Sequence, residues 1–158
     1  MVGMHNPHRD GDPLNPLHTS GKFMFELSGL SMEDYAAKFV RTNLVLKGGW
    51  SEQKATEGAR RVLLSPSCKG GWVAIIMLGR EVSLAFSRCR PAAGLEDLPL
   101  FRGAEYLGTR FIRFPHPSGR CRQWNEGQTR QAAEECLWSL YGKLRPEGQG
   151  RGLAGDSA

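Results

Sequence analysis

The chain has 158 residues, of which 40% are hydrophobic and 23% are charged, a composition typical of a globular protein with a single core. No apolar run approaches the roughly 18 residues of a membrane-spanning helix, which excludes an integral membrane protein, and the first residues lack a secretory signal. We therefore expect a cytoplasmic protein. The formal net charge is +5, and residues 102–145 hold eight basic and four acidic residues, which favours a polyanionic partner.

Strands and helices are predicted to alternate along the chain. A short apolar strand opens the sequence, and a loop rich in Pro and Gly follows it. Ser31 begins a capping box, Ser51 begins another helix, and the run WVAIIML has the continuous apolar character of a central parallel strand. In chain order we predict a strand at 1–4, helices at 20–30, 31–39 and 51–64, strands at 42–47 and 72–78, a helix at 80–89, a connection at 91–108 with a short β segment at 101–106, a strand at 110–114 and a helix at 128–144.

This order predicts an α/β fold of three layers, α/β/α, around a central four-stranded parallel sheet. We expect one domain over residues 1–144 and a disordered tail at 145–158, because the tail lacks apolar mass. Ligands of such folds bind beyond the carboxyl ends of the strands, so the residues that follow each strand are the first candidates for a site.

The segment that follows the last predicted strand is PHPSGR, in which two prolines flank His116. The prolines stiffen the backbone and keep His116 out of a helix, while Ser118 and the N–H groups near Gly119 are suited to holding a phosphate. Arg120 and Arg122 come directly after this turn. An ordinary tight turn with an incidental histidine is the alternative reading, and the basic run makes it less attractive.

Two asparagines are also candidates for the site, because they lie in or just after predicted strands. Asn6 follows the first strand, where its amide could orient a water molecule or contact a polar ligand, although Asn before Pro is also an ordinary turn former. Asn43 lies inside a predicted strand, where Asn is disfavoured and a buried amide needs partners. An Asn amide can pair with the Watson–Crick edge of a pyrimidine through one donor and one acceptor.

Taken in order, these segments resemble the uracil-DNA glycosylase superfamily over about residues 1–140. The first family motif, GMNPG or GINPG, is matched by GMHNP with His5 as a one-residue insertion, and the second, HPSP or NPSG, is matched by HPSG at residues 116–119. The strand with a base-reading Asn is matched by FVRTNL, and the apolar strand that ends in Leu-Gly is matched by IIMLG. The mismatch-specific and single-strand-selective monofunctional groups are the most similar, because their first motif carries Asn. The iron–sulfur groups have an N-terminal cysteine pair that this chain lacks.

The resemblance implies a monofunctional DNA glycosylase, a hydrolase that flips uracil or a modified pyrimidine out of DNA and hydrolyses its N-glycosidic bond, leaving an abasic site. It implies that Asn6 positions water and that His116 donates a hydrogen bond to the departing base. Neither a metal nor another cofactor is implied, and we expect a monomer. The residues assigned to the base are Met4, His5, Leu17, His18 and Asn43, and those assigned to the DNA backbone and wedge are Ser118, Gly119, Arg120, Arg122, Trp124 and Asn125.

Departures from the family pattern favour a modified pyrimidine as substrate. The loop that usually supplies an aromatic residue to stack on the base reads PLNPLH, in which Leu17 is our choice for that position and His18 is an alternative. Arg120 stands at a wedge position that is usually apolar.

Other functions stay open. A catalytically weak or inactive glycosylase-like domain that binds DNA or a flipped base without excision is favoured by the altered first motif. His5, His8 and His18 could instead form a metal cluster. The four cysteines form no CxxC pair, which leaves free thiols as their simplest state, and no glycine-rich phosphate loop supports a generic nucleotide enzyme.

Overall fold

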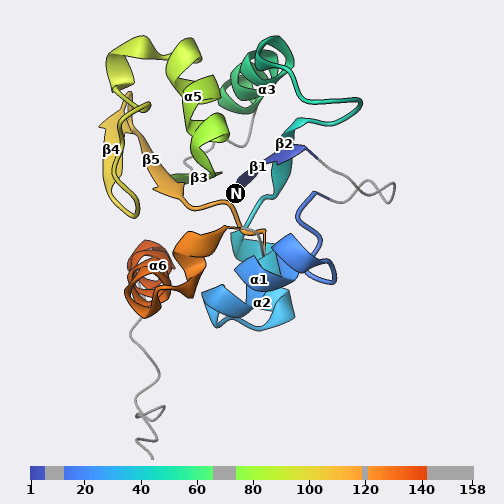
Figure 1. Ribbon diagram of the computed structural model, residues 1–158, viewed down its shortest axis with the longest axis vertical. Coiled ribbons are helices and arrows are strands. Elements are labelled where there is room, and N and C mark those ends of the chain that lie inside the picture. Colours follow the sequence, from blue (N-terminus) through green and yellow to red (C-terminus); the bar gives the residue numbers. More distant parts are fainter. Residues whose placement is uncertain (6–12, 66–73, 119–120, 142–158) are drawn as a thin grey trace, which may run out of the picture.

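The computed structural model describes residues 1–5, 13–65, 74–118 and 121–141, and Figure 1 shows the course of the chain. The predicted alternation of strands and helices is confirmed in these ranges, with boundaries that differ by a few residues. The elements are β1 (Val2–His5), α1 (Thr19–Ser28), α2 (Met32–Lys38), β2 (Thr42–Val45), α3 (Glu52–Leu64), β3 (Ala74–Leu78), α5 (Arg80–Cys89), the 3-10 helix η1 (Pro91–Ala93), β4 (Gly103–Tyr106), β5 (Thr109–Phe114), the 3-10 helix η2 (Arg122–Asn125) and α6 (Gly127–Tyr141).

Five strands form one sheet in the order β2-β1-β3-β5-β4. The first four strands in that order run parallel to one another, as predicted, whereas β4 is antiparallel to β5. A tight turn explains this fifth strand: Leu107 and Gly108 both have positive φ angles, 49° and 76°, and they reverse the chain so that Tyr106 pairs with Thr109. The β segment expected at residues 101–106 is therefore the edge strand of the sheet, and the sheet has five strands instead of four.

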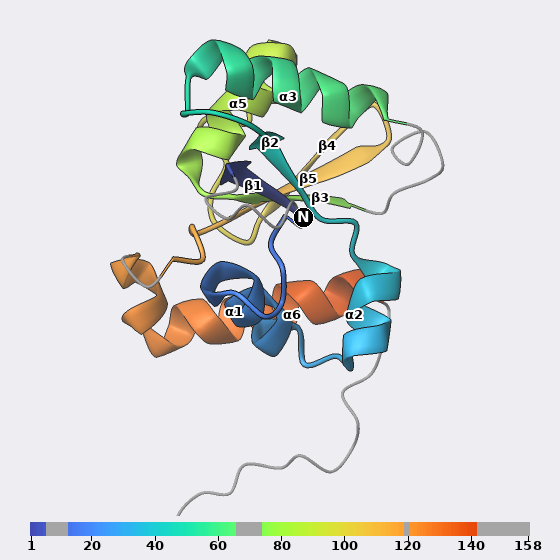
Figure 2. The same cartoon turned by 90° about the vertical axis from the view of Figure 1, so that its right-hand side faces the viewer.

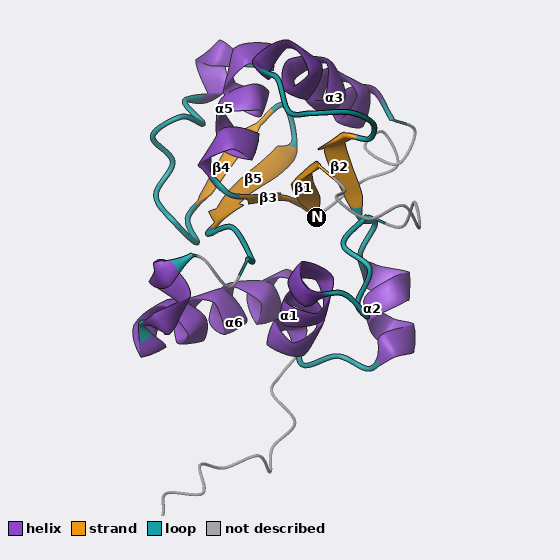
Figure 3. Cartoon of the chain, turned by 45° about the vertical axis from the view of Figure 1, so that its right-hand side comes forward, coloured by secondary structure: helices purple, strands orange, loops and turns teal. Residues whose placement is uncertain are grey.

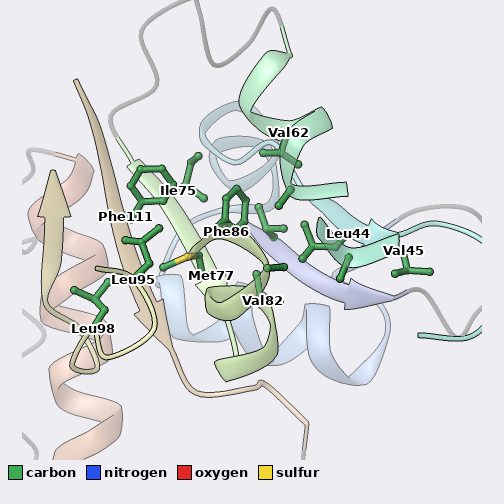
Figure 4. Close-up of a cluster of buried hydrophobic side chains, with 14 residues drawn as sticks. Leu44, Val45, Val62, Ile75, Met77, Val82, Phe86, Leu95, Leu98 and Phe111 are labelled. Carbon is green, nitrogen blue, oxygen red and sulfur yellow. The ribbon is translucent and has the colours of Figure 1, made fainter. Parts of the chain in front are cut away.

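The helices lie on both faces of the sheet. Figure 3 shows α3 and α5 above the strands and α1, α2 and α6 below them, and Figure 2 shows the same arrangement from another side. Each face has its own buried cluster. The cluster under α3 and α5 is centred on Phe86, which packs against Phe111 of β5 with ring centroids 5.8 Å apart (Figure 4). The opposite cluster includes Met24, Tyr35 and Leu137, which come from α1, α2 and α6.

Both predicted serine caps are present. The hydroxyl oxygen of Ser31 accepts a hydrogen bond from the backbone N–H of Asp34 at 3.1 Å, and Ser51 accepts one from Lys54 at 3.2 Å. These bonds satisfy N–H groups that have no partner within the first turn of a helix. They therefore fix where α2 and α3 begin.

None of the helices in the described ranges is both long and apolar enough to cross a membrane. The predicted tail at residues 145–158 lies outside those ranges, as does the last part of the helix expected to reach residue 144.

Gly58 permits the close crossing of α3 over β2, and substituting it tests the packing of these two elements. A Cβ at Gly58 would overlap the backbone of Leu44, which cannot move aside like a flexible side chain. We expect Gly58→Ala to lower the free energy of unfolding by about 1–3 kcal/mol, despite the higher helix propensity of Ala. Urea denaturation measures this loss.

Gly49→Ala is the matched control, because no atom lies within 4 Å of the position where its Cβ would be. Its stability should stay within about 0.5 kcal/mol of the parent protein. Equal stability of the two variants would contradict the packing of α3 on β2 described above.

Candidate functional site

The strand order has a switch point between β1 and β3. From β1 the chain passes to β2 on one side and then returns to β3 on the other, so the connections diverge at this point. In sheets of this type, ligands bind at the carboxyl ends of the strands on either side of such a divergence. His5 ends β1, Gly79 follows β3, and the His116 turn follows β5, so three of the predicted segments share one edge of the sheet.

The turn after β5 holds the His116 ring in a defined orientation. Pro115 and Pro117 are buried, while His116 itself is half-buried. The backbone N–H of Ser118 donates to Nδ1 of His116 at 3.2 Å. Because Nδ1 accepts this bond, the proton of the neutral imidazole is on Nε2, which makes Nε2 the donor atom of the ring.

Gly79 allows the β3–α5 connection to lie directly against this ring. Its φ angle is 99°, and an added Cβ would lie 3.4 Å from Cβ and 3.5 Å from Cδ2 of His116. Its N–H donates to the carbonyl oxygen of Phe114 at 2.9 Å, which joins the ends of β3 and β5. A side chain at this position would be strained by the φ angle and would crowd the imidazole, so glycine is required here.

Trp124 holds the backbone of the same turn. Its indole Nε1–H donates to the carbonyl oxygen of His116 at 2.9 Å, and its ring meets Phe23 of α1 edge-on, with centroids 4.7 Å apart. On another side it lies 6.4 Å from the ring of Phe101. The half-buried Trp124, which the sequence suggested as a DNA-facing residue, therefore also connects the His116 turn to the helical layer.

Asn43 is buried in β2, with only 3% of its surface exposed, and it pairs in register with Gly3 of β1. Its Oδ1 occupies the space that a side chain at residue 3 would take, so glycine at that position makes room for the amide. The backbone carbonyl of Asn43 accepts from Arg61 at 3.0 Å, whereas its side-chain amide makes no hydrogen bond within the described ranges. A buried amide in this state is suited to a ligand with a donor and an acceptor.

Leu14, which sequence reasoning missed, is the leucine beside Asn43. Its Cδ2 would lie 3.5 Å from a Cβ at Gly3, whereas the predicted Leu17 is 77% exposed and lies farther along the loop. Leu14 has a φ of 53°, which is unusual for a leucine. Gly21 of α1 accommodates this backbone, because a side chain there would overlap the carbonyl oxygens of Leu14 and Asn15.

A groove of about 480 Å³ lies between α1 and the segment from the His116 turn to η2. It brings together four residues assigned from the sequence, Leu17, Ser118, Trp124 and Asn125. Sequence reasoning missed the other lining residues, because they belong to a helix face and to the turn itself. They are Thr19, Lys22, Phe23, Glu26, Pro117 and Cys121.

The remaining assigned residues are distributed as follows. Met4 and His5 belong to β1, and His18 is the N-cap residue of α1, where its carbonyl oxygen accepts from the N–H of Lys22 at 2.7 Å. Arg122 is exposed in η2. Asn6, Gly119 and Arg120 lie outside the described residues.

Four groups with displaced pKa values lie away from the groove. Burial raises the pKa of the thiols of Cys89 and Cys136, and nearby arginines partly offset it. Burial also raises the pKa of Tyr141, and a hydrogen bond from Ser87 lowers the pKa of Glu96. Within the described ranges no three His, Cys, Asp or Glu side chains are grouped as metal ligands would be, and His8 of the suggested histidine cluster lies outside them.

Comparison with models of known protein families gives no match for this chain, and comparison with curated proteins gives none either.

Replacing Trp124 tests whether its indole holds the His116 turn. Trp124→Phe keeps an aromatic ring but removes the N–H that bonds the His116 carbonyl, so we expect a loss of about 0.5–1.5 kcal/mol in the free energy of unfolding. The imidazole resonances of His116 should shift in NMR spectra of the folded variant. Trp50→Phe, in the other cluster, is the control and should leave these resonances unchanged. Unchanged His116 resonances in Trp124→Phe would show that the indole does not position this turn.

Proposed function

We propose that this protein is a monofunctional DNA glycosylase that excises uracil or a modified pyrimidine. The observation that carries the proposal is the orientation of His116, whose Nδ1 accepts from Ser118 so that Nε2 is the donor, at the edge of the sheet where a ligand of this fold binds. The resemblance of the sequence to the uracil-DNA glycosylase superfamily suggested this residue for the same role. The α/β architecture, with four parallel strands and helices on both faces, is compatible with that family's fold.

The chemical step is the breaking of the N-glycosidic bond. The bonding electron pair leaves with the base, so negative charge develops on a carbonyl oxygen of the base while the sugar becomes oxocarbenium-like. A water molecule then adds to the sugar, and the proton that this water releases neutralises the base anion. His116 Nε2–H is suited to donating to that oxygen as the charge develops. Donors fixed in advance stabilise such charge more in the transition state than in the ground state.

The start of α5 supports the same assignment. Gly79 is the N-cap of this helix and lies against the His116 ring. The unpaired N–H groups at a helix start carry partial positive charge, which favours a developing anion nearby. The His116 donor and the start of α5 therefore both favour negative charge at this edge of the sheet.

Base choice is assigned to the pair formed by Asn43 and Leu14. In this proposal the Asn43 amide pairs with one donor and one acceptor on the edge of the pyrimidine, and Leu14 supplies an apolar contact in place of the aromatic residue usual in the family. A branched aliphatic side chain fills a different volume from a flat ring, which is consistent with a base that carries a substituent. Asn6 is assigned the water, from the resemblance alone.

Excision by the parent protein and by His116→Ala is the primary test. Labelled oligonucleotides that contain uracil, mismatched thymine, 5-hydroxymethyluracil or modified cytosines are incubated with each protein in the presence of EDTA. They are then treated with hot alkali, which cleaves the strand at abasic sites. We expect cleavage with one of these bases and a loss of about 100- to 1,000-fold in kcat for His116→Ala, since a single transition-state donor is removed.

Gln53→Ala, an exposed change on α3, is the control for this assay and should act like the parent. Full activity of folded His116→Ala would remove His116 from the mechanism. A parent protein that binds the oligonucleotides but cleaves none of them would favour the DNA-binding function without excision.

Asn43→Ala tests base recognition separately from bond cleavage. Losing the paired amide should lower kcat/KM for the preferred base by about tenfold to a hundredfold, because roughly 1–3 kcal/mol of hydrogen bonding to the base is lost. Thr42→Ala is the matched control, since neighbouring side chains of a strand point to opposite faces, and it should keep the parent's kcat/KM. Similar losses in the two variants, or none in Asn43→Ala, would contradict a base-reading role for Asn43.

A further inference from the structure

The groove between α1 and η2 is adjacent to the proposed excision site, but neither Asn43 nor Leu14, to which base choice is assigned above, lines it. Pro117 and Ser118 line it, and Ser118 is the residue whose N–H bonds His116. The two residues that follow His116 in the turn therefore line the groove, and a group held there lies beside the turn that carries His116. For a DNA substrate, the groups next to the excised base are those of the neighbouring nucleotides.

The lining of the groove favours a neutral, flat ring over a phosphate. Its only charged residues within the described ranges are Lys22 and Glu26, which lie 3.8 Å apart on successive turns of α1 and balance each other. Carboxylate and phosphate repel each other, so a groove that includes Glu26 is a poor phosphate site. The basic residue Arg122 is exposed on the neighbouring 3-10 helix, outside the groove lining, where a phosphate can be held.

Apolar and hydrogen-bonding groups share the remainder of the surface. Phe23, Trp124 and Pro117 form its apolar part, and Leu17 stands at its rim with 77% of its surface exposed. Thr19, Ser118 and Asn125 supply hydroxyl and amide groups. Aromatic and apolar side chains combined with a few polar groups are the usual means of holding an unpaired base. The volume of about 480 Å³ is within the range of small-molecule sites.

We propose that this groove binds the unpaired base next to the excised nucleotide. In a duplex that base is stacked and paired with the opposite strand, so it cannot enter the groove without further unpairing. This inference rests on the proposed glycosylase function for the identity of the substrate, but the groove can be tested without excision.

The binding test uses a single-stranded oligonucleotide in which a stable abasic analogue replaces the target nucleotide, so that no reaction occurs. A second and a third oligonucleotide lack the base on the 5′ or the 3′ side of the analogue. At fixed salt, fluorescence anisotropy should show binding that is weaker by about fivefold to a hundredfold when one of these two bases is missing, and nearly unchanged for the other. The corresponding duplex should bind more weakly and should not depend on either base.

Leu17→Ala links this effect to the groove. If the base that strengthens binding contacts the groove, its removal should weaken the binding of Leu17→Ala less than the binding of the parent, because the two changes remove the same contact. Leu107→Ala is the matched control: Leu107 is 80% exposed at the β4–β5 turn, at the opposite end of β5 from His116. That variant should respond to the missing base as the parent does.

Cys121 reports directly on occupancy, since it lines the groove. Iodoacetamide should alkylate Cys121 more slowly in the presence of the single-stranded oligonucleotide, but not in the presence of the one that lacks the critical base. Cys89 and Cys136 serve as internal references, because their raised pKa values leave less thiolate at a given pH and slow their alkylation with or without DNA.

The outcomes separate this proposal from the proposed function. Suppose that excision depends on His116, but that the binding affinity and the rate of Cys121 alkylation do not depend on either neighbouring base. This result would overturn the groove assignment and leave the glycosylase function intact. A neighbouring base that strengthens binding and protects Cys121, in a protein that excises nothing, would support the groove and overturn the glycosylase. Tighter binding of the duplex than of the single strand would show that the groove does not hold an unpaired base.

Discussion

The backbone N–H of Ser118 donates to His116 Nδ1, and this bond determines which nitrogen of the neutral ring carries the proton. Three features of the fold make the bond possible. The prolines on either side of His116 restrict the turn, Gly79 lets β3 end against the ring, and the indole of Trp124 holds the His116 carbonyl. The proposed chemistry depends on this arrangement, because a ring with its proton on Nδ1 would present an acceptor to the departing base.

Three glycines allow the close approaches around the site. Gly3 makes room for the Asn43 amide, Gly21 lets the Leu14 loop lie on α1, and Gly79 lies beside His116. Gly3 lies in β1, Gly21 in α1 and Gly79 in the β3–α5 connection, yet all three allow side-chain or backbone groups to pack where a methyl group would intrude. The unusual φ of Leu14 belongs to the same region, and strained residues of this kind are found most often at ligand-binding sites.

The sequence was most informative where local chemistry decides the structure. Ser31 and Ser51 marked the helix starts, and the apolar run of β3 marked the centre of the sheet, because caps and hydrophobic patterns act over short distances. It was least informative about contacts between distant segments. Nothing in the loop PLNPLH distinguished Leu14 from Leu17, because the choice depends on how that loop packs against Gly3 and Gly21. The groove was likewise missed, since Lys22 and Phe23 join it only when α1 packs beside η2.

The most direct measurement of the central claim is a ¹⁵N NMR spectrum of the His116 imidazole, assigned with His116→Ala and recorded with and without free uracil. At a pH where the ring is neutral, we expect its proton on Nε2 and a change in the Nε2 resonance when uracil is added. A proton on Nδ1, or an Nε2 resonance that stays unchanged when uracil or a modified pyrimidine base is added, would contradict the assignment of His116 as the donor to the departing base.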